Sequence, residues 1–280
     1  MTGIALVTGT SSGIGLHTAI ALAKAGYTVV ATMRNIAKSE ALLDAATAAG
    51  VNVDVRALDV QSAASTRQCV DSIVASYGRI DLLVNNAGSG FLAAFEETSF
   101  EQLQNVMDVN FYGVWRVTEA VYPLMRAAGS GRIITNTSIG GLIGQPFNDA
   151  YCAAKFAVEG FMESLAPVAK RLGVHVSIVE PGPVNTEFVN TVIAKHQSDG
   201  ARTLPSYDAM RTSYLSASSQ VFASMGQTGA DVAAVIVDIA AAEQPHLRYQ
   251  ASDMVRGLAG RKYVDTTGDS VIAMTGMRLG

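Results

Sequence analysis

Short apolar runs rich in β-branched residues alternate with longer amphipathic stretches along most of the chain. Six of these runs predict strands, at residues 4–9, 27–33, 52–58, 81–86, 132–138 and 175–182. Several of them are apolar throughout, which is typical of strands covered by helices on both faces. Because the crossover between parallel strands is right-handed, the alternation predicts an α/β fold with a doubly wound parallel sheet.

The amphipathic stretches predict the helices that connect these strands. Pro167 lies inside the last of the connecting helices and predicts a bend, because proline lacks a backbone donor. A later helix is predicted after Thr228, an N-cap with Asp231 three residues on, and residues 246–252 predict a final strand. The connecting helices are expected at residues 14–25, 39–49, 65–76, 99–127 and 151–172.

One segment interrupts the alternation. From about residue 187 to residue 227 the chain loses clear strand character, and a long irregular insertion in a compact domain is more often functional than accidental. We therefore expect a substrate lid within a single domain that spans residues 1–280. Its aromatic and methionine side chains suit an adaptable apolar pocket, although such residues more often pack a core. They are Phe188, Tyr207, Met210, Tyr214, Phe222 and Met225.

The composition excludes several classes of protein. Of the 280 residues 49% are hydrophobic, which is enough for a core. The net charge is -4 and no block of basic residues is present, so the sequence gives no sign of a surface that binds nucleic acid or an anionic membrane. We therefore expect a small-molecule partner. Cys69 and Cys152 are too few for a disulfide framework or a zinc site and favour a reducing cytoplasm. No apolar run approaches the ~18 residues of a membrane span, and the first residues enter a strand without a charged leader.

A glycine-rich turn, LVTGTSSGIG, follows the first predicted strand. Its glycines allow a tight turn and a close approach of the backbone to a ligand. The helix that begins here offers free N–H groups and the positive end of its dipole, so a pyrophosphate is the natural ligand. The alternative interpretation is a turn whose glycines serve packing alone. The candidate binding residues are Gly9, Ser11, Ser12, Gly13, Ile14 and Gly15.

Tyr151 and Lys155 lie four positions apart in the stretch NDAYCAAKFAVEG. On a helix this spacing places both side chains on one face, so they can share one site. A free tyrosine, with a pKa near 10, holds its proton too tightly to act as a base at neutral pH, but a nearby ammonium favours the phenolate. The alternative is that both residues lie on a solvated surface, and the pair alone arises by chance in many chains.

With its other motifs, the sequence resembles the short-chain dehydrogenase/reductase family over nearly the whole chain. The family's T-G-x-x-x-G-I-G is present at residues 8–15 and its N-N-A-G at residues 85–88. The segment EPGPVNT, residues 180–186, matches the part that reaches the nicotinamide. The resemblance implies a Rossmann-type sheet and a bound dinucleotide. It adds these cofactor-binding residues: Asn86, Ala87, Gly88, Pro181, Gly182, Val184 and Thr186.

Four residues match positions that carry chemistry in this family: Asn110, Ser138, Tyr151 and Lys155. The resemblance implies that Tyr151 is the acid/base catalyst, because hydride transfer to a carbonyl leaves an oxygen that must gain a proton. Lys155 is expected to favour the phenolate and to hydrogen-bond the nicotinamide ribose. Ser138 is expected to donate to the reacting oxygen, unless it only caps a strand end. Asn110 is expected to hold a water near the lysine, unless it only fills a helix interior.

The second predicted strand ends in VVATMRN, where NAD-binding sheets place an acidic residue for the adenosine ribose. Met33 occupies that place and Arg34 follows it. Because an arginine here can neutralise a 2′-phosphate, we expect NADP(H) to be preferred over NAD(H); the alternative is a solvated surface arginine. Asp59 and Val60 resemble the family's adenine contacts, although aspartate is also typical of a turn at a strand end.

Residues 151–188 look most like the 17β-hydroxysteroid dehydrogenase and retinol dehydrogenase branch of the family. That resemblance implies an enzyme that interconverts a secondary alcohol and a ketone on a bulky, steroid- or retinoid-like substrate. One alternative is a reductase for a 3-oxoacyl, sugar, aldehyde or aromatic ketone substrate, and another is a non-catalytic NADP-sensing protein. The resemblance also implies a homodimer or homotetramer, formed through the helices predicted at 99–127 and 151–172.

Overall fold

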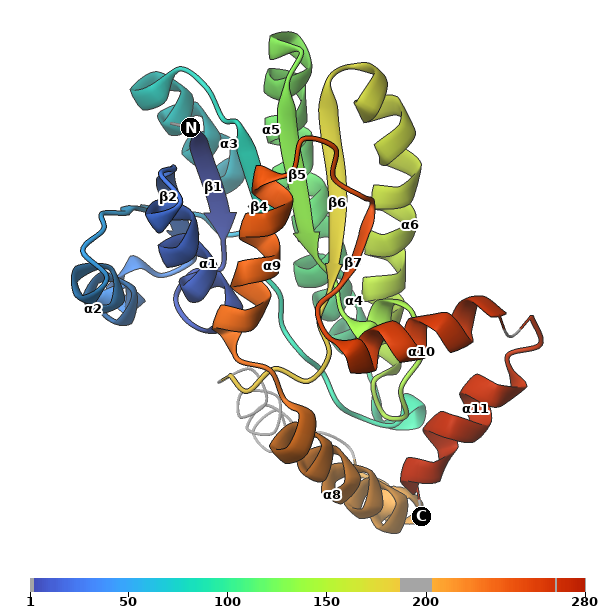
Figure 1. The fold of residues 1–280 in the computed structure, drawn as a ribbon. Helices are drawn as coiled ribbons and strands as arrows, with labels where there is room; N and C mark the ends of the chain where they lie inside the picture. Colours follow the sequence, from blue (N-terminus) through green and yellow to red (C-terminus); the bar gives the residue numbers. More distant parts are fainter. Residues whose placement is uncertain (1–2, 187–202, 265, 280) are drawn as a thin grey trace.

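A computed structural model describes residues 3–186, 203–264 and 266–279, and of residues 271 and 272 it describes the backbone only. In these residues, seven strands form one sheet in the order β3-β2-β1-β4-β5-β6-β7 (Figure 1). Every neighbouring pair is parallel. The predicted parallel, doubly wound sheet is therefore confirmed. The strands are β1 (Ile4–Thr8), β2 (Thr28–Met33), β3 (Asp54–Ala57), β4 (Leu82–Asn85), β5 (Gly131–Asn136), β6 (Val174–Glu180) and β7 (Arg248–Gln250).

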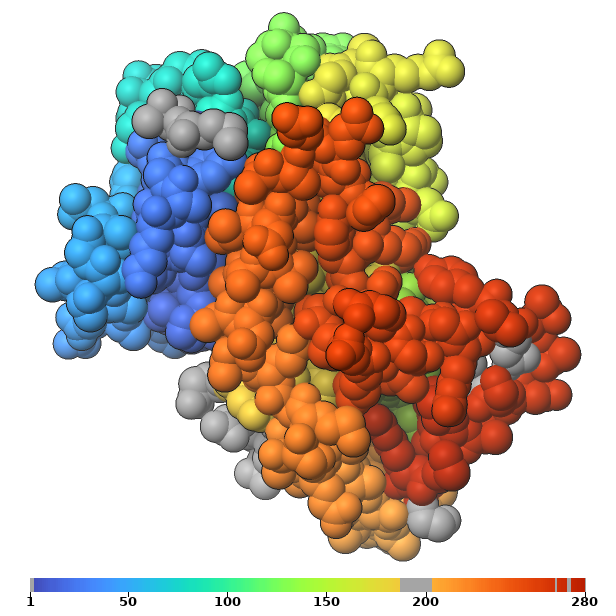
Figure 2. Space-filling model, in the orientation of Figure 1, coloured from blue at the N-terminus to red at the C-terminus, as the bar shows by residue number. Residues whose placement is uncertain are grey.

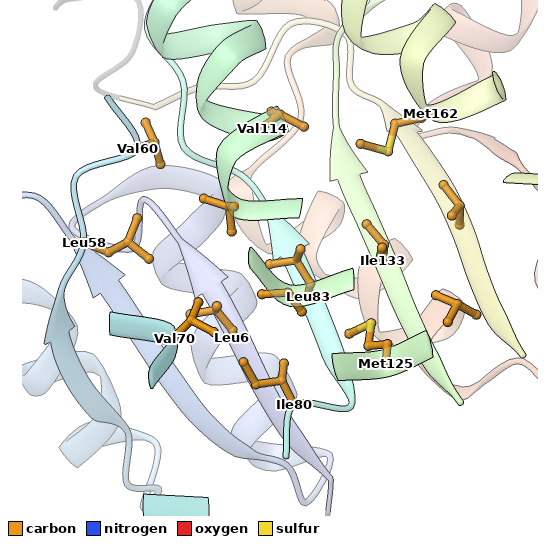
Figure 3. Close-up of a cluster of buried hydrophobic side chains, with 14 of the residues drawn as sticks. Leu6, Leu58, Val60, Val70, Ile80, Leu83, Val114, Met125, Ile133 and Met162 are labelled. Atoms are coloured by element: carbon orange, nitrogen blue, oxygen red, sulfur yellow. The ribbon is translucent and has the colours of Figure 1, made fainter. Parts of the chain in front are cut away.

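Helices cover both faces of the sheet. Successive side chains of a strand point to opposite faces, so Leu6 belongs to one apolar cluster while Ala5 and Val7 belong to the other. Figure 3 shows the first cluster, which includes side chains of α3, α5 and α6. On the opposite face α1, α2 and α9 contribute to the second cluster. These helices are α1 (Gly13–Lys24), α2 (Glu40–Ala48), α3 (Ala63–Tyr77), α5 (Gly113–Ala128), α6 (Asp149–Arg171) and α9 (Gly229–Ala241).

The winding of the chain reverses between β1 and β4. The chain passes from β1 to β2 on one side and from β4 to β5 on the other, so the two connections leave in opposite directions. A crevice therefore opens at the carboxyl ends of β1 and β4, where sheets of this kind bind their ligands. The glycine turn follows β1, and the N-N-A-G segment begins at the last residue of β4.

The prediction of one continuous helix at 99–127 is wrong, because the helix is interrupted. It consists of α4 (Phe100–Met107), a π-helical turn (Asp108–Tyr112) and α5. Asn110 lies in that turn, and its Nδ2 donates to the carbonyl oxygen of Val106 (3.0 Å). In a regular α-helix this carbonyl accepts from the backbone N–H of residue 110, so the side chain competes with the helical ladder. Such π turns frequently occur at functional sites.

The prediction of an irregular lid is wrong from residue 208 onward, because α8 (Asp208–Met225) is a long helix. Polar residues interrupt its apolar side chains, and Arg211 and Tyr214 are its buried residues, so its sequence shows little helical period. Phe188 and the segment up to residue 202 lie outside the described residues. Two helices that the sequence analysis does not predict follow β7: α10 (Asp253–Val264) and α11 (Asp269–Gly276).

Several predictions for the second half of the chain are confirmed. The N–H of Asp231 donates to Thr228 Oγ1 (3.2 Å) and the N–H of Thr228 donates to Asp231 Oδ2 (2.7 Å), which forms the expected helix cap. The final strand is β7, parallel to β6. Helix α6 continues through Pro167, and the bend there stays a prediction. Among the described helices, none is both long enough and apolar enough to cross a bilayer.

Candidate active site

One cavity of about 1120 Å³ lies at the carboxyl ends of the central strands. Residues that are far apart in the sequence meet here, because the ends of parallel strands share one edge of the sheet. The structure brings all the predicted site residues to the wall of this cavity. They are Gly9, Ser11, Ser12, Gly13, Ile14, Gly15, Arg34, Asp59, Val60, Asn86, Ala87, Gly88, Asn110, Ser138, Tyr151, Lys155, Pro181, Gly182, Val184 and Thr186.

The turn after β1 has a backbone that favours glycine. Gly9 and Gly13 have φ angles of +72° and +58°. A Cβ on Gly15 would lie 2.2 Å from the carbonyl oxygen of Gly9 and 2.4 Å from Asn86 Nδ2, so a larger residue would push the turn apart. Helix α1 begins here without a side-chain cap from Ser12 and without an acidic residue in its first turn. Its free N–H groups fit the pyrophosphate of a dinucleotide.

Asn86 joins the glycine turn to the end of β4. Its Nδ2 donates to the carbonyl oxygens of Thr8 (2.9 Å) and Gly9 (3.0 Å), and its backbone N–H donates to Thr8 Oγ1 (3.0 Å). At the end of β5, Asn136 Nδ2 donates to Asn86 Oδ1 (2.9 Å). These bonds fix three strand ends relative to one another. Asn136 was not among the predicted site residues, although its place two residues before Ser138 at a strand end was an available signal.

Ser138, Tyr151 and Lys155 meet where β5 ends against α6. The side chains of Ser138 and Tyr151 are hydrogen-bonded to each other, and Ser138 Oγ accepts from the N–H of Gly140 (3.0 Å). Lys155 Nζ donates to the carbonyl oxygen of Asn136 (3.2 Å) and lies 5.8 Å from the centre of the Tyr151 ring. A hydroxyl, a phenol and an ammonium therefore line the same part of the cavity.

Burial determines the protonation of the phenol and the ammonium. It raises the pKa of Tyr151 to about 12, and the hydrogen bond with Ser138 acts against that rise. It lowers the pKa of Lys155 to about 8, and the Glu159 carboxyl acts against that fall. Desolvation of the phenol dominates the net shift in this structure, and the expectation that Lys155 favours the phenolate stays a prediction. At neutral pH Tyr151 is protonated and can donate its proton.

Asn110 is fully buried and holds the segment that follows β4. Its Oδ1 accepts from the N–H of Ser89 (3.1 Å), and its Nδ2 donates to the carbonyl oxygen of Ser89 (2.9 Å). A Cβ on Gly88 would lie 2.9 Å from Asn110 Oδ1 and 3.6 Å from Lys155 Nζ, so this glycine fills the space between the two side chains. Asn110 thus positions a wall of the cavity, and its water-holding role stays a prediction.

The cavity extends to the ends of β2 and β3. Met33 is buried and Arg34 is exposed, and both line the cavity. Within the described part of the chain Arg34 forms no ion pair, so its charge is available to an anion. Asp59 Oδ1 accepts from the N–H of Gln61 (3.0 Å), a bond that fits the alternative interpretation of Asp59 as a turn residue. Its place on the wall fits the adenine contact.

The C-terminal part of the chain supplies a large apolar portion of the wall. Leu215 and Phe222 come from α8, Met254 and Leu258 from α10, and Met274 from α11. In the space-filling view the orange and red C-terminal segments run over the front of the molecule from its upper part to its lower end (Figure 2). Phe222 was among the residues expected at the lid, whereas α10 and α11 were not predicted, since no motif marks them. This portion of the cavity suits a bulky apolar ligand.

A small polar cluster interrupts the apolar wall beside α6. Asn148 Nδ2 donates to the hydroxyl of Tyr214 (2.9 Å), and that hydroxyl lies 3.5 Å from Gln145 Oε1. Tyr214 is one of the residues expected to form the lid, and all three side chains line the cavity. Asn148 precedes Tyr151 by three residues, so the cluster adjoins the proposed catalytic groups.

The family model for short chain dehydrogenases matches residues 3–197. The chain belongs to the short-chain dehydrogenase family. It is 42% identical to retinol dehydrogenase 8 of Homo sapiens over 276 residues, which cover 96% of this chain and 88% of the relative. It is 38% identical to 17-beta-hydroxysteroid dehydrogenase type 1 of Homo sapiens over 280 residues, which cover 96% and 83%.

Solved structures of this family share the fold. A short-chain dehydrogenase from Streptomyces avermitilis is 29% identical with a TM-score of 0.80, over 99% of this chain and 95% of that chain. Actinorhodin polyketide ketoreductase with NADPH is 31% identical with a TM-score of 0.76, over 89% and 95%. A Burkholderia phymatum protein in complex with NAD, 24% identical, shows the same fold with a TM-score of 0.81, over 94% of each chain. The chain is thus an oxidoreductase of a family that binds nicotinamide cofactors.

In this family member a buried ion pair fixes α8 beside the cavity. Arg211 Nη2 contacts both carboxylate oxygens of Glu97 and lies 2.5 Å from Oε2. Glu97 also accepts from the backbone N–H groups of Ala94 (3.1 Å) and Leu204 (2.8 Å). Burial acts to raise the pKa of Glu97, but these donors and the guanidinium together hold it below its usual value. Because loss of one partner would leave a buried charge unpaired, the pair holds α8 against the segment after β4.

Proposed function

We propose that this short-chain dehydrogenase is an NADP(H)-dependent oxidoreductase that interconverts a secondary alcohol and a ketone on a bulky hydrophobic substrate. One observation carries the proposal. A single cavity extends from the glycine turn and Arg34 to Ser138, Tyr151 and Lys155, and there it meets an apolar wall. The first part suits a dinucleotide phosphate, and the second part suits an apolar carbonyl compound.

Tyr151 is the proposed acid/base catalyst. A nicotinamide cofactor, when bound, supplies the hydride for reduction of the ketone. The substrate oxygen must then gain a proton, which the phenol of Tyr151 donates. Ser138 Oγ hydrogen-bonds the same oxygen and stabilises its developing charge. Lys155 stabilises the phenolate that remains, and in the oxidation direction the phenolate takes the proton back.

The proposed substrate is steroid- or retinoid-like. The apolar side chains of α8, α10 and α11 support this proposal, and so do the names of the two relatives, which specify retinol and 17-beta-hydroxysteroid. The steroid hydroxyl is a secondary alcohol, as the proposed reaction requires, whereas retinol is a primary alcohol and its name supports only the bulky apolar class. Competing substrate classes are 3-oxoacyl thioesters, sugars, aldehydes and aromatic ketones. A non-catalytic NADP-sensing protein is the second candidate function, but a sensor has no need of the Ser138, Tyr151 and Lys155 set.

Tyr151→Phe should lower turnover by about 10²- to 10⁴-fold, the usual contribution of a general acid or base. The affinity for NADPH should not change, because the ring and Lys155 remain. Turnover is measured by NADPH absorbance on a panel that covers the proposed and competing substrates, and binding by NADPH fluorescence. Near-normal turnover of the variant would remove the catalytic assignment. Wild-type protein that binds NADPH but reduces no compound would favour the sensor.

Arg34→Ala should raise the KM for NADPH by about 10- to 100-fold, because a hydrogen bond to a charged group contributes about 1.5–3 kcal/mol. The KM for NADH should stay unchanged, since NADH lacks the 2′-phosphate. Lys38→Ala is the matched control, because Lys38 is exposed after the same strand and does not line the cavity. An unchanged preference between the two cofactors in Arg34→Ala would refute the role of Arg34.

We also propose that the protein forms a homodimer or homotetramer through α5 and α6. Trp115 is 46% exposed and stacks on Phe161 with 4.6 Å between ring centres. Tyr112 is exposed beside the same group of rings, in contact with Phe111. Exposed aromatic residues that gather on one face are enriched at protein interfaces.

Sedimentation velocity should give the mass of two or four subunits, and Trp115→Glu should lower that mass. A monomeric wild type would contradict the proposal.

The cytoplasm is the proposed compartment. Cys69 and Cys152 are free and buried, and burial raises the pKa of each thiol to about 11. Free thiols are typical of reducing compartments. Fractionation of the source cells, followed by detection of the protein, tests this assignment.

A further inference from the structure

Behind the proposed catalytic pair lies a cluster of buried charged groups that the proposed mechanism does not use. Glu159 follows Lys155 by one helical turn on α6 and is only 5% exposed. Its carboxyl group accepts from the guanidinium of Arg248 in β7 and from the hydroxyl of Thr137 at the end of β5. Arg248 also donates to Glu180 Oε1 (2.8 Å), and Glu180 is fully buried at the end of β6.

This cluster connects the elements that carry the active site. Thr137, the hydroxyl partner of Glu159, directly precedes Ser138 in the sequence. A Cβ on Gly141 would lie 3.0 Å from the Cγ of Glu159, so Glu159 also packs under the 3-10 turn that follows Ser138. Glu180 directly precedes the proline–glycine segment of the cavity wall. Glu159 therefore contacts the turn that carries Ser138 and shares a helix with the ammonium and the phenol.

The buried charges of this region balance only when Glu159 is ionised. Glu163 also pairs with Arg248, but its side chain is exposed to solvent. Lys155 and Arg248 supply two positive charges, and Glu159 and Glu180 supply at most two negative charges. A buried charge is costly unless an opposite charge lies near it. Among the described ion pairs both carboxylates pair with Arg248, and neither pairs directly with Lys155. Glu159 is nevertheless close enough to act on the pKa of Lys155, which it raises against the effect of burial.

We propose that Glu159 is a positioning residue for Lys155: held by Arg248 and Thr137, its carboxylate supplies the negative charge that keeps the Lys155 ammonium at the active site. This inference rests on the proposed function, because it assigns Lys155 a task in turnover. Burial raises the pKa of Glu159 to about 7, so the carboxylate forms near neutral pH. The other groups that act on Glu159 or feel its charge are Glu180 on β6, Arg248 on β7 and Tyr263 on α10, and the exposed Glu163 on α6 pairs with Arg248.

The sign of the effect follows from these charges. The ammonium of Lys155 is present below its pKa of about 8 and is lost above it. An anionic Glu159 holds that pKa up, so removal of the carboxylate lets burial lower it further. The ammonium is then lost at a lower pH. Activity that needs the ammonium should therefore fall earlier on the alkaline side.

Glu159→Gln is the direct test, because glutamine keeps the shape and the acceptor for Thr137 but carries no charge. The alkaline limb of the kcat profile for ketone reduction with NADPH should move down by at least ~0.5 pH unit. Glu159→Asp keeps the charge, so the alkaline limb of its kcat profile should lie at the same pH as that of the wild type. Glu163→Gln is the matched control, because Glu163 also accepts from Arg248 (2.8 Å) but is exposed, and its profile should match the wild type.

Coincident profiles for the wild type and Glu159→Gln would overturn the inference, and so would a lower thermal stability without any shift of the limb. Should Glu159→Gln not fold, Glu159→Asp still decides. Because aspartate keeps the negative charge, the alkaline fall of its kcat profile should lie at the wild-type pH, and a fall that begins ~0.5 pH unit or more lower would overturn the inference. A wild-type protein without any NADPH-linked turnover would contradict both the proposed function and this inference. An active wild type whose kcat profile is unchanged by Glu159→Gln would contradict the inference alone.

Discussion

Burial of a phenol and an ammonium on one face of α6 is the constraint on which the rest of the site depends. Desolvation moves both groups toward their uncharged forms, since it raises the pKa of Tyr151 and lowers that of Lys155. A charge that develops here is therefore costly unless nearby polar groups stabilise it. The hydroxyl of Ser138, the carbonyl of Asn136 and the carboxyl of Glu159 lie where they can do so. The site combines a low-dielectric wall with a few fixed dipoles and charges.

The fold provides this arrangement through the shared edge of its parallel strands. Asn86 connects the ends of β1 and β4, and Asn136 connects β5 to the same group. On the other side of the cavity, the buried pair of Glu97 and Arg211 holds α8 in place. The glycine turn and the apolar wall are thus parts of one framework, so a ligand that occupies both would meet groups in preset positions. Such preorganisation reduces the cost of positioning a substrate.

The sequence predicted the elements whose signal is local. Apolar runs located the strands, the glycine spacing located the turn after β1, and the four-residue spacing placed Tyr151 and Lys155 on one face. Effects that depend on tertiary contacts were not predictable. The π-helical turn arises from a side-chain bond of Asn110 to Val106 and Ser89, and α8 lacks a clear apolar period. The pKa of Tyr151 depends on how deeply the phenol is buried. The role of Glu159 depends on its contact with Arg248, which lies 89 residues away in the sequence.

The central claim is that Tyr151 exchanges a proton once a nicotinamide lies in the cavity. Its most direct test is a pH titration of tyrosine phenolate absorbance with and without NADP⁺, in which the difference between wild type and Tyr151→Phe isolates one of the nine tyrosines. A cationic nicotinamide favours the phenolate, so NADP⁺ should lower the pKa of Tyr151 below the ordinary value near 10. A Tyr151 phenol that titrates at the same high pH with and without NADP⁺ would contradict it.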